Sequence, residues 1–154
     1  ESTEDGYLSF NIPVKEITGE DGNGKVWGNF QVFEKKDGDV MLGMTTNLCE
    51  EGACQGQILF LDYKGGKFTD VSEDYILQPD NDEIIKTLRD APAFENKDSL
   101  KDGEQVPLFI TFGGTDKIVN FIAGGKDGDG GVVAKMFKWN GEAFVEFEYE
   151  ESPE

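Results

Sequence analysis

The chain has 154 residues and a formal net charge of −18, with 32 acidic residues against 14 lysines and arginines and no histidine. This length holds one domain with a sizeable core. The charge excludes binding to nucleic acid or to an anionic membrane surface, which needs clustered lysine and arginine, and no apolar run approaches the roughly 20 residues of a transmembrane helix.

The first half of the chain predicts strands joined by glycine-rich turns. Alternating apolar residues indicate strands over 7–14, 26–34 and 40–46. A hairpin is expected over residues 57–75. We place its two-residue turn at Lys64-Gly65, because this register sets Asp62 opposite Lys67, whereas a Gly65-Gly66 turn would set two lysines opposite each other.

A short helix is predicted over residues 80–91. Acidic residues cluster at its start, Ile84, Ile85 and Leu88 form one apolar stripe, and Pro92 ends it. About ten residues are too few for a stable isolated helix, so we expect it to dock on a sheet.

The strongest signal is a hairpin over residues 131–150, preceded by strands over 108–112 and 117–123. Asn140-Gly141 is typical of a two-residue type I′ turn, and it predicts that Trp139 faces Glu142. Alternation then gives two faces, of which the more apolar is expected to face the core: Val132, Ala134, Met136, Val145, Phe147 and Tyr149.

This hairpin resembles the one 76 residues earlier, so we interpret residues 26–75 and 106–150 as an internal pseudo-repeat with a helix-containing connection over 76–105. The alternative is that two unrelated hairpins look alike. The predicted fold is a single mainly β domain over residues 1–154. It has two related antiparallel meanders in a sandwich-like, split-barrel or two-blade arrangement, with one short helix.

Two cysteines, Cys49 and Cys54, lie in a segment that we expect to be a loop between strands. A structural disulfide between them is favoured over zinc, because no histidine is present, and over a redox pair, because the spacing is not Cys-x-x-Cys. A disulfide implies an oxidising compartment and hence export. The acidic opening, ESTED, is interpreted as a solvated tail of the mature protein.

Aspartates alternate with glycine in several turns, and hard oxygen ligands at such spacing suit calcium. The candidate ligands are Asp37, Asp39, Asp127 and Asp129. No EF-hand is complete, since Lys138 stands where the loop from Asp127 needs its final glutamate, and Asp-Gly is also what tight turns prefer. Apart from this calcium alternative, no cofactor is expected.

An aromatic group forms the candidate ligand platform, a surface for sugar rings or a partner protein. It consists of Trp139, Phe137, Phe144 and Tyr63. The alternative is that the helix over 80–91 and neighbouring loops cover these rings as a second small core.

Residues 35–44, KKDGDVMLGM, and 58–72, ILFLDYKGGKFTDVS, resemble exported Bacteroidetes-type proteins and, distantly, FG-GAP or integrin-like propeller repeats. The resemblance implies export and a non-catalytic module. The chain lacks the full Asp-x-Asp-Gly-Asp cage of those repeats.

No common catalytic route fits the sequence: histidine triads are impossible, no serine lies in Gly-x-Ser-x-Gly, and no phosphate-binding loop is present. We therefore expect a non-enzymatic extracytoplasmic binding module for an unknown protein or glycan. We expect it in the periplasm or at the cell surface, lipid-anchored if a lipidated cysteine precedes Glu1. The alternatives are an acidic inhibitor or regulator of a basic enzyme, and a calcium-stabilised structural domain.

Overall fold

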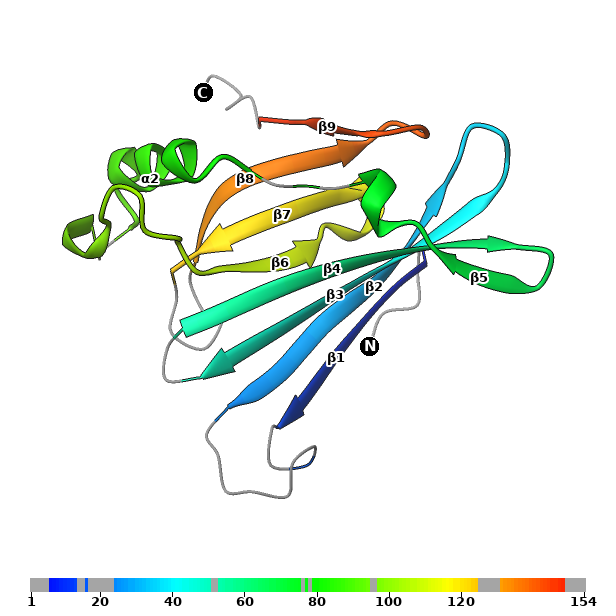
Figure 1. The fold of residues 1–154 in the computed structure, drawn as a ribbon, viewed down its shortest axis with the longest axis horizontal. Coiled ribbons are helices and arrows are strands. Elements are labelled where there is room, and N and C mark those ends of the chain that lie inside the picture. Colours follow the sequence, from blue (N-terminus) through cyan, green and yellow to red (C-terminus); the bar gives the residue numbers. More distant parts are fainter. Residues whose placement is uncertain are drawn as a thin grey trace.

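The structure, a computed structural model, describes residues 6–13, 16, 24–50, 53–75, 77, 79–94, 97–124 and 131–148. It is mainly β, with antiparallel sheets of five and four strands that are not closed into a barrel (Figure 1). Among the helices of these residues, none has an apolar stretch that would cross a lipid bilayer.

The five-stranded sheet is a meander whose strands neighbour each other in chain order. They are β1 (Tyr7–Pro13), β2 (Lys25–Glu34), β3 (Val40–Glu50), β4 (Ala53–Lys64) and β5 (Lys67–Asp70). β3 is longer than predicted, because the cysteine segment continues the β3–β4 ladder as far as the Glu50–Ala53 pair. The cysteines are therefore strand residues, and the expected loop placement was wrong.

The four-stranded sheet is a second meander, of β6 (Leu108–Phe112), β7 (Ile118–Ala123), β8 (Val132–Trp139) and β9 (Phe144–Glu146). The connection between the sheets holds α2 (Asn81–Asp90) and the 3₁₀ turns η2 (Ser72–Tyr75) and η3 (Lys97–Ser99), and η4 (Gly114–Asp116) precedes β7. Two antiparallel meanders with one short helix confirm the predicted fold class. The internal repeat stays a prediction.

The register of the first hairpin differs from the prediction. Lys64 pairs with Lys67 and Tyr63 with Phe68, so the turn is Gly65-Gly66, the alternative that had been rejected. Both glycines have positive φ, 58° and 78°, which a type I′ turn needs at its two central residues. Lys64 forms an ion pair with Asp39 at 2.8 Å, which offsets its repulsion from Lys67.

The second hairpin also differs in register, because Trp139 pairs with Phe144 across a four-residue connection. The side-chain oxygen of Asn140 accepts hydrogen bonds from the backbone N–H groups of Glu142 and Ala143, both at 2.9 Å. Asn140 therefore stabilises a longer loop instead of occupying a two-residue turn. Propensity alone does not separate these two uses of Asn-Gly.

The prediction of which hairpin face points to the core was right for Ala134, which is 6% exposed, but wrong for Val145. Trp139, on the other face, is only 8% exposed, whereas Val145 is 51% exposed. Trp139 and Phe144 pack on Phe33 and Phe60 of the five-stranded sheet. Alternation separates the two faces of a strand, but it does not say which face another sheet covers. In addition, the β7–β8 register shift leaves Ala134 unpaired and breaks the alternation along β8. Tyr149 lies outside the described residues.

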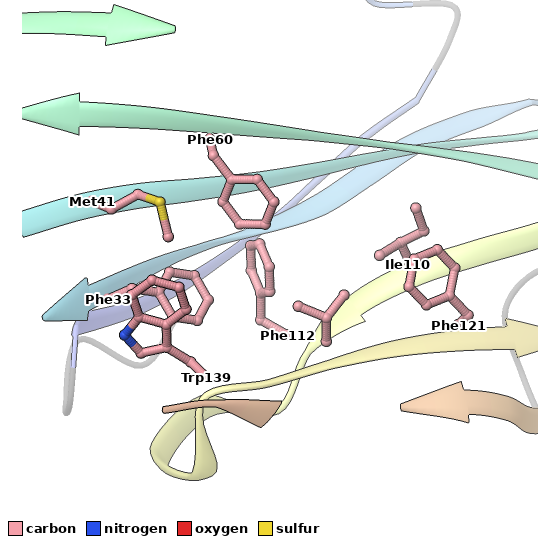
Figure 2. Packing of buried hydrophobic residues seen from close by; sticks show 8 residues of the cluster. Phe33, Met41, Phe60, Ile110, Phe112, Phe121 and Trp139 are labelled. Carbon is pink, nitrogen blue, oxygen red and sulfur yellow. The ribbon is translucent and has the colours of Figure 1, made fainter. Parts of the chain in front are cut away.

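The main core is an aromatic cluster between the two sheets (Figure 2). Phe33 lies at its centre, with ring centroids 5.4 Å from Phe112, 6.0 Å from Trp139 and 6.1 Å from Phe60, all edge to face. The indole Nε1 of Trp139 donates to the backbone oxygen of Glu34 at 2.8 Å, so its buried polar atom is satisfied.

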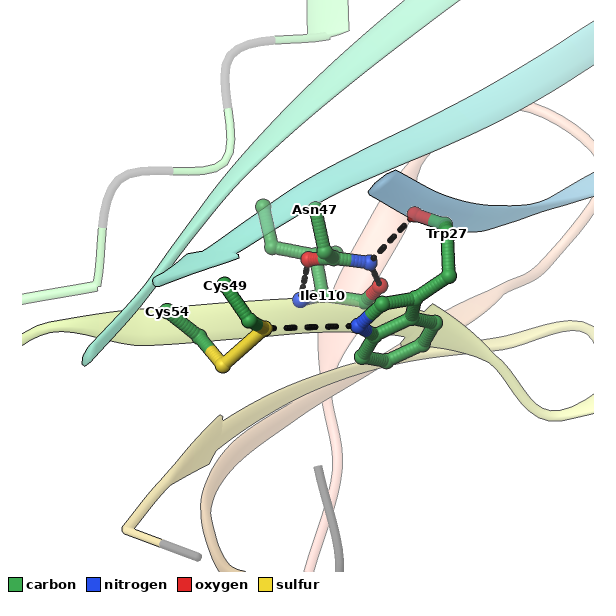
Figure 3. Close-up of a disulfide and its surroundings, with 5 residues drawn as sticks. All are labelled: Trp27, Asn47, Cys49, Cys54 and Ile110. Carbon is green, nitrogen blue, oxygen red and sulfur yellow. Dashed lines mark hydrogen bonds between the residues drawn. A yellow bond between two sulfur atoms is a disulfide. The ribbon is translucent and has the colours of Figure 1, made fainter. Parts of the chain in front are cut away.

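Edge strand β6 meets the inner face of the five-stranded sheet directly. The side-chain Nδ2 of Asn47 donates to the backbone oxygen of Ile110 at 2.8 Å, and the backbone N–H of Ile110 donates to Oδ1 at 2.6 Å (Figure 3). Asn47 is fully buried. Gly56 permits this approach, because a Cβ there would lie 2.7 Å from Asn47 Oδ1 and 2.9 Å from Ile110 N.

Helix α2 forms as predicted and begins at its N-cap Asp80, which accepts from the backbone N–H groups of Asp82 and Glu83. Its apolar stripe packs against Ala123 and Ala134 at one end of the four-stranded sheet. The helix does not contribute to the cluster that holds Trp139. The expectation that the helix itself covers the aromatic platform was therefore wrong, although the helix docks on a sheet. Trp139 is nevertheless buried, and the neighbouring segment that packs on it is η2, through Tyr75.

Candidate functional site

The predicted disulfide is present between Cys49 and Cys54, which are direct cross-strand partners with Cα atoms 4.1 Å apart. Both are buried and pack with Phe109 of β6 and with Trp27, whose Nε1 donates to Cys49 Sγ at 3.4 Å (Figure 3). A thiol pair enclosed this way is structural, because an attacking thiolate cannot reach it easily.

The candidate platform residues do not share one accessible surface. Trp139 and Phe144 belong to the main core, and Phe137 packs at its margin against Phe121 with ring centroids 5.8 Å apart. Tyr63 is 48% exposed and contacts Phe68, which is 57% exposed. Of the four rings, Tyr63 is the one that offers a large accessible surface to a ligand.

The candidate calcium ligands divide into two groups. Asp127 and Asp129 lie outside the described residues. Asp37 accepts from the backbone N–H of Asp39 at 3.0 Å, and the carboxylate of Asp39 pairs with Lys64. The hydrogen bond from Lys64 lowers the pKa of Asp39. These contacts are those of a tight turn, and no group of three or more metal-binding side chains occurs within the described ranges.

Among the described residues, two lysines form the ion pairs that are best shielded from solvent. Lys35 lies 2.6 Å from Asp62 with a side chain only 16% exposed; burial lowers its pKa, and the hydrogen bonds to Asp62 and Tyr75 outweigh this and raise it overall. Lys135 bridges Glu146 and Glu83, and hydrogen bonds to both raise its pKa. Lys135 reaches Glu146 although the observed register sets Phe137 opposite Glu146, and Asp62 pairs with Lys35 instead of Lys67.

An open depression of about 430 Å³ lies beside α2, lined in part by Asp82, Lys86, Arg89 and Asp102. Arg89 pairs with Asp102 at 3.0 Å, and its guanidinium donates to the backbone oxygen of Leu100 at 3.2 Å. Its cation is thus already engaged, and the depression offers no converging set of groups for catalysis.

The feature that stands out is the outer side of the five-stranded sheet. Strand alternation and the observed registers put a continuous set of apolar side chains on this side, which we call the outer apolar face. It consists of Leu8, Phe10, Ile12, Val26, Phe30, Val32, Val40, Leu42, Met44, Leu48, Leu59, Leu61, Tyr63 and Phe68.

No described element packs over the outer apolar face. The three hydrophobic clusters take their residues of the five-stranded sheet from the inner side only. Of the seven exposed large apolar side chains in the described ranges, five belong to this face, so exposed apolar area is concentrated here rather than scattered.

The outer apolar face is also depleted of charge. Among the described side chains on this side of the sheet, two are charged, Glu34 and Asp70. They are the last residues of β2 and β5 and so lie at strand ends. Polar positions between the apolar ones are neutral, such as Thr46 and Gln57. In a chain with a net charge of −18, a broad region without carboxylates is a marked local departure from the composition.

Local packing orders this face. The rings of Phe10 and Phe30 lie with centroids 5.5 Å apart, and the Phe10 ring covers Gly28, where a Cβ would lie 2.9 Å from Phe10 Cζ. The same Cβ would lie only 1.9 Å from the backbone oxygen of Thr45, so β3 as well as Phe10 restricts this position to glycine. This face was not predicted, because each strand was expected to be apolar on one side only. The signal that could have found it is that β3 is apolar at both parities over Val40–Met44.

No protein-family model and no curated protein matches the chain. Among solved structures, a domain of an uncharacterized protein from Porphyromonas gingivalis W83 is similar, with a TM-score of 0.50 and 11% sequence identity. The alignment covers 80% of this chain and 66% of that chain. At this identity the similarity concerns the fold alone.

Proposed function

We propose that this chain is a non-enzymatic extracytoplasmic interaction module that binds a protein through its outer apolar face. The single observation that carries the proposal is a charge-depleted apolar sheet face over which no described element packs. A soluble chain rarely exposes a contiguous apolar area of several hundred Å² unless another molecule covers it.

The disulfide supports the extracytoplasmic part of the proposal. Structural disulfides persist in oxidising compartments such as the periplasm and the cell exterior, and a buried Cys49–Cys54 pair is compatible with export. We place the module in the periplasm or at the cell surface, where a lipid anchor would hold it to the membrane.

The geometry favours a flat apolar contact over the acidic-regulator alternative. An inhibitor of a basic enzyme would present carboxylates at its contact surface, whereas the outer apolar face has none among its central described residues. Binding through this face is expected to tolerate or increase with added salt, while binding through carboxylates would weaken.

The test is photo-crosslinking from defined positions in cells that produce the protein. A benzophenone amino acid replaces Leu59, at the middle of the outer apolar face, or Val145, which is exposed on the other sheet and serves as the matched control. We expect a protein adduct from position 59 and none from position 145. Folded protein that gives no protein adduct from position 59 would contradict the proposal.

A further inference from the structure

We infer that the partner on the outer apolar face is a second copy of this chain, so that two five-stranded sheets pack back to back in a symmetric dimer. This inference rests on the proposed function, because it names the occupant of the same surface.

The size of the face fits such a dimer. Five strands spaced about 4.8 Å apart, with about nine residues each rising about 3.3 Å, give a face of about 24 by 30 Å, or about 700 Å². A standard stable interface buries about 800 Å² on each partner. One pair of these faces is therefore large enough for a specific dimer without help from other parts of the molecule.

The chain's own remaining residues lack the apolar side chains to cover the face. Outside the described ranges, the large apolar residues among the 154 are Val14, Ile17, Ile76 and Tyr149, and the rest are mostly acidic, small or polar. Four scattered side chains cannot cover an area of about 700 Å². The occupant must therefore come from another molecule or from chain beyond these residues.

A second copy satisfies the chemistry that the face requires. The partner surface must be equally broad, apolar and free of charge at its centre, since an unpaired buried carboxylate would be costly. The outer apolar face of a second copy has the same composition, because the two chains are identical. In a dimer with a twofold axis, this one surface of each copy contacts the same surface of the other. Sheets that pack face to face keep their strands within about 30° of each other, which two identical twisted sheets can adopt.

The position of Met44 makes the inference specific. β3 is the middle strand of the five, and Met44 is near its midpoint on the outer side, between Phe30 and Leu59. A twofold axis that relates two such faces and lies in the plane between them passes close to the centre of each. Met44 of one copy then lies near Met44 of the other.

The experiment is sedimentation analysis of the purified chain across a wide concentration range. We expect a particle of twice the single-chain mass of 17.0 kDa. Met44→Glu and Met44→Lys should each raise the dimer dissociation constant at least about a hundredfold, because each copy then buries a like charge near the axis. An equimolar mixture of the two variants should recover the dimer mass, since the charges are then opposite.

The control is Val145→Glu, a charge at an exposed apolar position of the other sheet, which should leave the dimer intact. Urea unfolding of every variant checks that the fold is retained. Raising the salt concentration should strengthen the dimer, because it screens the repulsion between two chains of charge −18.

Two results would overturn the dimer: wild-type protein that sediments as a monomer at the highest concentration, or Met44 variants that remain dimeric. The crosslinking arm separates this failure from that of the proposed function. Monomeric protein with an adduct from position 59 to a different protein refutes the dimer and keeps the interaction module. Monomeric protein without any adduct refutes both.

Discussion

The side-chain amide of Asn47 pairs with both backbone polar groups of Ile110, 63 residues further along the chain. The amide thus makes the two hydrogen bonds that a residue of a neighbouring strand would make. It pairs the backbone N–H and C=O of β6 at the edge of the sheet where no strand lies beside β6. Buried backbone groups are rarely left unpaired, so this side chain fixes β6 against the five-stranded sheet.

Asn47→Ala should therefore be strongly destabilising. It removes the partners of a buried N–H and a buried C=O together, which we expect to lower the free energy of unfolding by about 2–4 kcal/mol. Urea unfolding followed by circular dichroism measures the change. Asn120→Ala is the matched control: Asn120 is half-buried and donates to Thr111 at 3.4 Å, so its loss should cost less than about 1 kcal/mol. Equal losses for the two variants would contradict this role of Asn47.

Gly56→Ala should weaken the same junction from the other side. The added Cβ would lie 2.7 Å from Asn47 Oδ1 and 2.9 Å from Ile110 N, so β6 must move away from the sheet. Overpacking of this kind costs about 1–3 kcal/mol. The control is Gly113→Ala, where the nearest atom is Ile118 Cβ at 3.3 Å and φ is −87°. Thermal unfolding of both variants should show the larger decrease for Gly56→Ala.

Reduction of the disulfide should lower stability without unfolding the protein. Cys49 and Cys54 are five residues apart, and in the chain-entropy account so small a loop contributes about 2 kcal/mol. Protein that is reduced while unfolded and refolded in dithiothreitol should show this difference from untreated protein in urea unfolding. The Cys49→Ala, Cys54→Ala double variant should be as unstable as the reduced protein and insensitive to reductant. A reductant effect on the double variant would mean that the disulfide is not its cause.

The ion pairs of Lys135 should stabilise the protein in a pH-dependent way. Hydrogen bonds to Glu146 and Glu83 raise the pKa of Lys135 above its ordinary value of 10.5. A raised folded-state pKa means that the stabilisation is fully present below the unfolded pKa and is lost as the pH rises through the folded pKa. The stability difference between wild type and Lys135→Met should therefore be constant near neutral pH and shrink above pH 10.5.

The matched control for Lys135 is Lys36→Met, which breaks the exposed Lys36–Glu142 pair. Solvent screening limits such a pair to less than about 1 kcal/mol. A Lys135 effect that grows as the solution becomes more alkaline would reverse the sign expected here.

Sequence reasoning found the elements better than their registers. Periodicity located the strands, and the stripe of Ile84, Ile85 and Leu88 located the helix, because these signals are local. Both hairpin registers were wrong, since Gly65, Gly66 and Asn140 are compatible with turns of different position or length. The disulfide followed from two cysteines in one short segment.

The covered and uncovered faces of the sheets could not be predicted in the same way. Trp139 lies on a strand face that carries Lys135 and Glu146, and that face became the core because the five-stranded sheet packs on it. The outer apolar face was not predicted because the sequence does not show which side of a strand stays uncovered. Strands such as β3 are apolar on both sides, and which side stays open depends on where β6 docks, through Asn47 and Ile110.

The junction between Asn47 and Ile110 also has a kinetic consequence. Every strand pair in either meander joins neighbours in the chain, so each meander closes through short loops, whereas the junction brings together residues from different halves of the protein. We expect such a contact to form after the strands of each meander have paired, and therefore after the transition state for folding. Its loss should then change the unfolding rate. Removing Asn47 should accelerate unfolding while leaving the folding rate nearly unchanged.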